Sequence, residues 1–163
     1  ALGAKVIATA GSDDKCAACL KLGADHAINY RTQDFSAEAL RLTGGRGVDV
    51  AVTCAPAPEL QGQAIDCLAR FGRLNFFSGL TKGTKAEIDT NKVHYWSLKL
   101  LGSTGSSLDD YTRALALVET GKVDVGAVVS HRFGMRDAVA AFDHALSGNG
   151  MKTVILPQME VAP

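Results

Sequence analysis

Residues 5–15 read KVIATAGSDDK, and this stretch decides the fold class. Its first six residues form an apolar, partly β-branched run, which is typical of a short strand that ends at Gly11. Ser12 and the two aspartates after it are typical of the first turn of a helix, which we predict over residues 13–22. A strand that passes through a glycine turn directly into a helix indicates one unit of a parallel β-α-β fold.

The same alternation of strand and helix continues along the chain. We predict further strands at residues 26–30, 48–54, 73–78, 98–103, 128–133 and 152–156, helices at 34–43, 59–69, 107–120 and 136–147, and a long loop at 79–97. Strands that alternate with helices predict an α/β fold with a parallel sheet. The run at 48–54 is largely apolar on both faces, as a strand covered by helices on both sides requires.

The composition excludes several classes of protein. Of the 163 residues, 47% are apolar, which is enough for a sizeable core, and 17 basic residues balance 17 acidic ones. Zero net charge gives no sign of binding to nucleic acid or to an anionic membrane. No apolar run reaches the ~18 residues of a membrane span, and nothing suggests a secretory signal. We therefore expect a cytoplasmic protein.

The cysteines fit a reducing compartment. Cys54 and Cys67 stand apart, whereas Cys16 and Cys19 form a CxxC inside the predicted helix. This spacing puts both thiols on one helix face, but no second CxxC and no histidine pair at ligand spacing completes a metal site. The pattern favours small residues that pack a helix over a zinc or redox site.

Parallel sheets bind ligands at the carboxyl ends of their strands. Most residues at these ends are small, so a ligand could approach the backbone. Ser12 and Lys15 could hold a phosphate at the start of the helix, although residues 11–13 are equally consistent with a plain turn and helix cap. The predicted strand ends are residues 10–12, 30–31, 54–56, 78–80 and 103–105, and the candidate binding residues there are Ala10, Gly11, Ser12, Tyr30, Cys54, Ala55, Ser78, Gly79, Leu80, Ser103 and Gly105.

Two long phrases resemble known enzymes. Residues 3–49 (GAKVIATAGSDDKCAACLKLGADHAINYRTQDF…LTGGRGVD) resemble the cofactor domain of zinc-free quinone oxidoreductases. Residues 71–157 (FGRLNFFSGLTKG…KVHYWSLKLLGSTGSSLDDYTRALALVETGKVD…SHRF…MKTVILP) resemble zinc-dependent polyol and alcohol dehydrogenases. Both groups are branches of the medium-chain dehydrogenase/reductase superfamily, and the two halves of the chain point to different branches.

The resemblance implies a Rossmann-type, doubly wound parallel sheet that binds a nicotinamide dinucleotide. The whole enzyme would be an NAD(P)-dependent oxidoreductase that transfers hydride to or from an alcohol, a polyol or a quinone. NAD enzymes usually place an acidic residue where Ala10 stands, to hold the 2′-hydroxyl of the ribose. Because Ser12 and Lys15 could hold a 2′-phosphate instead, the resemblance implies NADP, with NAD as the alternative if Asp13 or Asp14 turns inward.

The other site residues follow from the same resemblance. Cys54 and Ala55 would lie beside the adenosine. The wall of the nicotinamide pocket would be residues 78–80, and the backbone of Ser103 and Gly105 would receive the carboxamide. Lys152 resembles a basic position that reaches the pyrophosphate, although an exposed lysine that opens a strand is an equally good explanation.

The chain also departs from the family pattern. It contains no GxGxxG turn, which in the family precedes a phrase like that of residues 1–6. It contains no amino-terminal catalytic domain, so zinc is possible only in that absent domain, and His26, His94, His131 and His144 do not replace its ligands. We expect no catalytic residue here, and no activity from this chain without a longer parent protein. Alternatives are a nucleotide-binding module without catalysis, or a structural protein that keeps the fold without a cofactor.

The domain organisation follows from the same comparison. Residues 1–125 would be a partial dinucleotide-binding domain, and residues 126–163 a segment that returns to the catalytic domain. The family strand order is 3-2-1-4-5-6, so a sheet without strand 1 is interrupted between residues 5–10 and 48–54. The strand at 98–103 then forms an edge, and it is apolar with one lysine. With Tyr95 and Trp96 before it, we expect a homodimer through residues 92–103, unless these aromatic residues fold back on their own domain.

Overall fold

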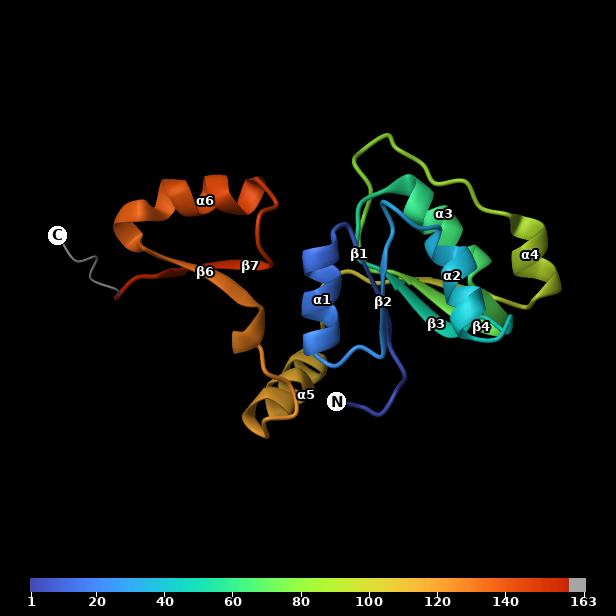
Figure 1. The fold of residues 1–163 in the computed structure, drawn as a ribbon, viewed down its shortest axis with the longest axis horizontal. Coiled ribbons are helices and arrows are strands. Elements are labelled where there is room, and N and C mark those ends of the chain that lie inside the picture. The colour runs from blue at the N-terminus through green and yellow to red at the C-terminus, as the bar shows by residue number, and fades with distance from the viewer. Residues whose placement is uncertain (159–163) are drawn as a thin grey trace. The chain divides into compact units, whose positions relative to one another are not determined.

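The computed structural model describes residues 1–158, which divide into two compact units (Figure 1). Residues 5–106 form one unit, and residues 1–4 with 107–158 belong to the other. The sequence analysis placed the boundary after residue 125, one helix further along. The assignment of these units to functional domains stays a prediction.

The first unit alternates strands and helices, as the sequence predicted. Its elements are β1 (Ile7–Ala10), α1 (Asp13–Lys21), β2 (His26–Asn29), α2 (Phe35–Leu42), β3 (Val48–Thr53), α3 (Pro58–Asp66), β4 (Leu68–Phe76), α4 (Thr90–Tyr95) and β5 (Lys99–Gly102). The second unit contains α5 (Leu108–Glu119), β6 (Val129–Gly134), α6 (Ala138–Leu146) and β7 (Lys152–Leu156), with short 3-10 turns at Gly126–Val128 and Met135–Asp137. The α/β fold class is confirmed. Among residues 1–158, no helix combines the length and the hydropathy that a membrane crossing needs.

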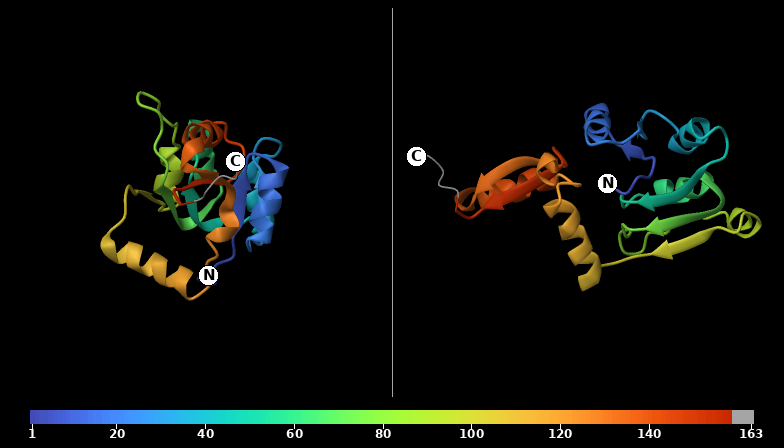
Figure 2. Two further views of the ribbon diagram at one scale, coloured as in Figure 1. Left: turned by 90° about the vertical axis from the view of Figure 1, so that its left-hand side faces the viewer. Right: turned by 90° about the horizontal axis from the view of Figure 1, so that it is seen from below.

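The strands of the first unit form two separate parallel sheets. β1 pairs with β2, and β3, β4 and β5 pair in that order, as the right-hand view of Figure 2 shows. Within the described residues, no strand pairing joins β1 to β3, which is the interruption that the strand order predicted. One edge of β1 and one edge of β3 therefore carry backbone groups without a neighbouring strand.

The expectation that the third strand is covered on both faces is wrong for one face. Val50 and Val52, which alternate along β3, are 47% and 53% exposed. Thr53, at the end of the same strand, is buried. The apolar pattern correctly indicated a strand, but it does not reveal which of its faces a helix of this chain covers.

Two element boundaries also differ from the sequence prediction. We predicted a helix to residue 69 and a strand from 73, whereas α3 ends at Asp66 and β4 begins at Leu68. Leu68 pairs with Val48 ahead of a register shift, and Phe71 in the shifted segment has a φ of 62°. A short apolar run satisfies a helix or a strand equally, so here the pairing with β3 decides. The predicted loop at 79–97 also contains α4.

The core of the first unit lies between the strands and the helices that cover them. Its most deeply buried side chains are Ile28 of β2, Ile65 of α3, and Leu68 and Leu74 of β4. Figure 1 shows α2 and α3 side by side in front of β3 and β4. The core therefore holds the strands through the face that the helices cover. The carboxyl ends of the strands continue into the connecting turns.

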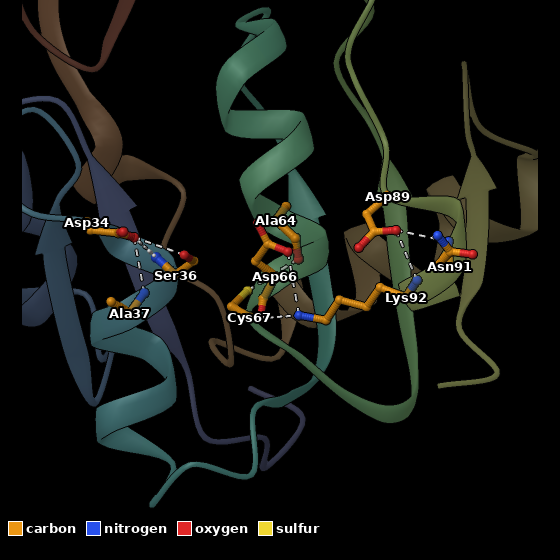
Figure 3. Close-up of polar contacts among 9 residues, drawn as sticks. All are labelled: Asp34, Ser36, Ala37, Ala64, Asp66, Cys67, Asp89, Asn91 and Lys92. Carbon is orange, nitrogen blue, oxygen red and sulfur yellow. Dashed lines mark hydrogen bonds and ion pairs between the residues drawn. The ribbon is translucent and has the colours of Figure 1, made fainter. Parts of the chain in front are cut away.

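Short-range polar contacts fix the helix ends (Figure 3). Asp34 caps α2 by accepting hydrogen bonds from two backbone N–H groups of its first turn, at 2.9 and 3.1 Å, and these bonds lower the pKa of its carboxyl. Asp89 caps α4 in the same way. Lys92 of α4 then donates from Nζ to the backbone oxygen of Asp66 at 2.8 Å, which ties α4 to the end of α3.

The turn before β3 allows a test of the packing. Gly47 has a φ of +89°, and a Cβ added there would lie 2.7 Å from backbone atoms of Cys67, Leu68 and Ala69. Gly45 has a φ of +82° with open space around it. We predict that Gly45→Ala lowers the free energy of unfolding by about 1 kcal/mol through backbone strain alone. Gly47→Ala should cost about 3 kcal/mol, because it adds an overpacking penalty.

Urea denaturation of the two variants and the unchanged chain measures this difference. Gly45→Ala is the matched control, since its backbone strain is similar and its surroundings are empty. Equal losses in the two variants would contradict the close approach between this turn and the start of β4.

Candidate functional site

The turn between β1 and α1 lies against the end of β2. Ala10 pairs with Asn29, and the backbone N–H of Tyr30 donates to the oxygen of Ala10 at 3.1 Å. A Cβ added to Gly11 would lie 2.7 Å from the hydroxyl of Tyr30 and 3.3 Å from Nε of Arg31. Glycine is therefore the residue that leaves room for these two side chains over the turn.

Ser12 is the N-cap of α1, the first helix after this turn. Its hydroxyl accepts a hydrogen bond from the backbone N–H of Lys15 at 3.4 Å. The positive end of the helix dipole and its N–H groups point toward the same turn. The structure thus brings together five predicted site residues around one anion-favouring turn, and these are Ala10, Gly11, Ser12, Lys15 and Tyr30.

The nearby acidic residues have different surroundings. Asp13 accepts a hydrogen bond through Oδ1 from the side-chain amide of Asn29 at 2.7 Å, and Asn29 is only 8% exposed. Asp14 is exposed. The sequence alone leaves open whether either aspartate turns inward. Arg31 belongs to the strand end predicted at residues 30–31, without an assigned role, whereas Asn29 is not among the predicted residues. Asn29 directly precedes Tyr30 at this strand end, and this position is the signal that could have found it.

A second group surrounds a pocket of about 430 Å³ at the carboxyl ends of β4 and β5, called here the β4–β5 pocket. It contains the predicted residues Ser78, Gly79, Leu80 and Ser103. Gly105 follows the same strand end with a φ of 66° but does not line the pocket. The full lining is Gln61, Phe76, Phe77, Ser78, Gly79, Leu80, Gly102, Ser103 and Thr104.

Two amide side chains brace this pocket. Gln61, which is buried, donates from Nε2 to the backbone oxygen of Ser78 at 2.9 Å. Asn75 donates from Nδ2 to the hydroxyl of Ser103 at 2.9 Å. The sequence analysis missed both residues, because a glutamine inside a helix and an asparagine inside a strand give no local pattern. They hold the pocket walls in place through hydrogen bonds that are remote in sequence.

Three other predicted residues lie outside these two groups. Cys54 is exposed and Ala55 half-buried directly after β3, and neither lines the β4–β5 pocket. Lys152 begins β7 in the second unit. Their contacts with a dinucleotide stay predictions.

The described residues do not provide a donor set for a catalytic zinc. Such a site takes three protein ligands, and residues 1–158 contain no group of three or more His, Cys, Asp or Glu placed to hold a metal. In the CxxC, Cys16 is buried and Cys19 half-buried, and burial is the main cause that raises the pKa of Cys16. Burial also raises the pKa of Cys67 to about 11, so this thiol stays protonated at neutral pH.

Comparison with known proteins identifies the family of the chain. The family model described as zinc-binding dehydrogenase matches residues 1–120. An alcohol dehydrogenase of Cupriavidus necator is 30% identical over 145 residues, which are 85% of this chain and 38% of that protein. A 2-haloacrylate reductase of a Burkholderia species is 32% identical over 173 residues, or 96% of this chain and 49% of that protein.

The solved structures give the same result. The benzyl alcohol dehydrogenase of Acinetobacter calcoaceticus superposes with a TM-score of 0.85 at 25% identity, covering 93% of this chain and 42% of that one. The chain thus spans less than half the length of these relatives. The resemblance drawn from the sequence phrases is confirmed, and the fold is of the Rossmann type. The chain belongs to the zinc-binding dehydrogenase family of the medium-chain dehydrogenase/reductase superfamily.

Proposed function

We propose that this chain is the cofactor-binding portion of an NAD(P)-dependent oxidoreductase that prefers NADP. The observation that carries the proposal is the β1–α1 turn, where Ala10 takes the place of an acidic residue. Around it lie the hydroxyl of Ser12, the start of α1 and the hydroxyl of Tyr30. Asp13, the nearest carboxylate in sequence, is hydrogen-bonded to Asn29. This environment favours a 2′-phosphate over a bare 2′-hydroxyl.

When bound, the nicotinamide supplies the hydride chemistry, and the protein supplies binding and orientation. Residues 78–80 and Ser103 line the pocket that would receive the nicotinamide end. Gln61 and Asn75 keep these walls in place.

The substrate class rests on the relatives. An alcohol dehydrogenase and a 2-haloacrylate reductase both match this chain, which supports oxidation or reduction of an alcohol, a polyol, or an activated double bond such as that of a quinone. The substrate-binding and metal-binding groups would belong to the part of such enzymes that this chain does not span. A cytoplasmic location, and the absence of nucleic-acid and membrane partners, stay predictions.

The first test concerns cofactor preference in a longer protein that joins this chain to a Gly-rich turn. We predict that it binds NADP more tightly than NAD in calorimetric titrations. Ala10→Asp should reduce NADP affinity at least tenfold, about 1.4 kcal/mol, because a carboxylate would face the 2′-phosphate. Ala17→Asp, on the exposed side of α1, adds the same charge away from the turn and should leave the preference intact. Tighter binding of NAD by the unmodified protein would refute the proposal.

The second test concerns activity. We predict that the purified 163-residue chain alone shows no hydride transfer, because its sequence contains no GxGxxG turn and its described residues contain no metal donor group. Absorbance at the nicotinamide band, with alcohols, polyols and quinones as substrates, measures this. Turnover by the chain alone would contradict the assignment as a cofactor-binding portion. A longer parent that binds nucleotide without turnover would instead favour a non-catalytic module.

We also propose a homodimer through residues 92–103. In the part of the chain that the structure describes, β5 is an edge strand that pairs with β4 alone, and Leu101 on it is 51% exposed. Tyr95 before it is 70% exposed. Trp96 instead packs against its own core, with the cations of Arg70 and Lys92 over its ring at 5.3 and 4.7 Å. Tyr95 and Leu101 therefore carry the proposal.

The dimer is tested by sedimentation velocity on a longer parent protein. We predict that Tyr95→Ser combined with Leu101→Lys makes it monomeric, since a charge would occupy the apolar edge. Leu20→Lys, at a half-exposed position on α1, is the matched control and should leave the dimer intact. A monomeric unmodified parent, or a double variant with unchanged self-affinity, would show that the interface is elsewhere.

A further inference from the structure

We propose that Arg31 selects for the 2′-phosphate at the β1–α1 turn, and that Asn29 is the positioning residue that holds Arg31 and Asp13 in place. The inference rests on the proposed NADP preference. It assigns this preference to Arg31, which the strand-end pattern included without a role, and to Asn29, which the pattern did not include. It follows from how the side-chain amide of Asn29 contacts both the carboxylate of Asp13 and the backbone N–H of Arg31.

Asn29 uses both ends of its side-chain amide. Its Nδ2 donates to Asp13 of α1 at 2.7 Å, and its Oδ1 accepts from the backbone N–H of Arg31 at 3.1 Å. Its own backbone N–H donates to the side chain of Gln33 at 3.3 Å. Asn29 is only 8% exposed. Breaking either of its two side-chain hydrogen bonds therefore leaves a buried polar group of Asn29 without a partner.

The side chain of Arg31 lies beside the turn that would bind the 2′-phosphate. Its Nε is 3.3 Å from the position of a Cβ on Gly11, so the guanidinium side chain crosses the turn beside the hydroxyl of Tyr30. Arg31 is exposed, and among the described residues no carboxylate forms an ion pair with it. A guanidinium with several donors in one plane suits a phosphate dianion well.

The amide of Asn29 contacts both residues that carry opposite charges at this turn. Its NH₂ group engages the carboxylate of Asp13, which would otherwise repel a phosphate or accept a hydrogen bond from a 2′-hydroxyl. Its carbonyl oxygen fixes the backbone from which Arg31 extends. Loss of Asn29 should therefore weaken phosphate binding without a direct contact between Asn29 and the ligand.

The test uses the full 163-residue chain and three adenosine phosphates followed by NMR titration. Adenosine 2′,5′-bisphosphate and adenosine 5′-monophosphate differ only in the 2′-phosphate, and adenosine 3′,5′-bisphosphate carries the same charge at the wrong position. We expect the unmodified chain to bind the 2′,5′-bisphosphate most tightly. Arg31→Gln should lower this affinity about tenfold and change the affinity for the monophosphate less than twofold.

Asn29→Ala should lower the preference for the 2′,5′-bisphosphate to a similar degree. If Asn29 acts through Arg31, the double variant should lose no more of the preference for the 2′,5′-bisphosphate than Arg31→Gln alone. A double-mutant cycle measures this. A purely structural role would weaken binding of all three nucleotides alike. Lys85→Gln and Asn91→Ala, at exposed positions of the same unit, are the matched controls and should change nothing.

The outcomes separate this inference from the proposed function. A chain that binds the three nucleotides without preference would overturn both. A chain that prefers the 2′,5′-bisphosphate, with the preference unchanged in Arg31→Gln, would overturn the inference and leave the NADP preference standing. Because Arg31 is exposed, this arm remains decisive even if the buried Asn29→Ala variant does not fold.

Discussion

Backbone hydrogen bonding between neighbouring parallel strands is the constraint on which the candidate site depends. Parallel pairing places successive carboxyl ends at the same edge of a sheet, so residues far apart in sequence meet there. β1 and β2 bring the Gly11 turn under Tyr30 in this way. β4 and β5 bring Ser78 and Ser103 to one pocket.

Electrostatics then decides what this edge can bind. A helix start, a guanidinium and two hydroxyl groups surround the β1–α1 turn, while the nearest carboxylate in sequence is hydrogen-bonded to a buried amide. At the other end, the β4–β5 pocket is lined mainly by apolar and small residues with a few hydroxyl groups. The first of these regions has groups that suit a phosphate and the second has walls that suit a flat ring, and a nicotinamide dinucleotide contains both.

Local sequence patterns were sufficient to predict the strands, but they did not predict the hydrogen bonds between elements. The β-branched runs before Gly11 and Cys54 predicted β1 and β3 within a few residues. Leu68 lies in a short apolar run that fits the periodicity of a helix as well as that of a strand, and we predicted it as helical. Only its pairing with Val48 makes it a strand residue. The hydrogen bond between Asn29 and Asp13 spans 16 positions, so no sequence window as long as one of these helices or strands contains both residues.

The interruption between β1 and β3 affects which parts of the first unit unfold together. The two sheets share side-chain packing, with Ile28 of one and Leu74 of the other in the same core, but no backbone ladder crosses between them. Local unfolding of a protein proceeds in cooperative units that often coincide with supersecondary motifs, and β1–α1–β2 is one such motif. A dinucleotide that contacts both the β1–α1 turn and the β4–β5 pocket would couple these segments, so part of its binding free energy would appear as protection of β1 and β2 against local unfolding.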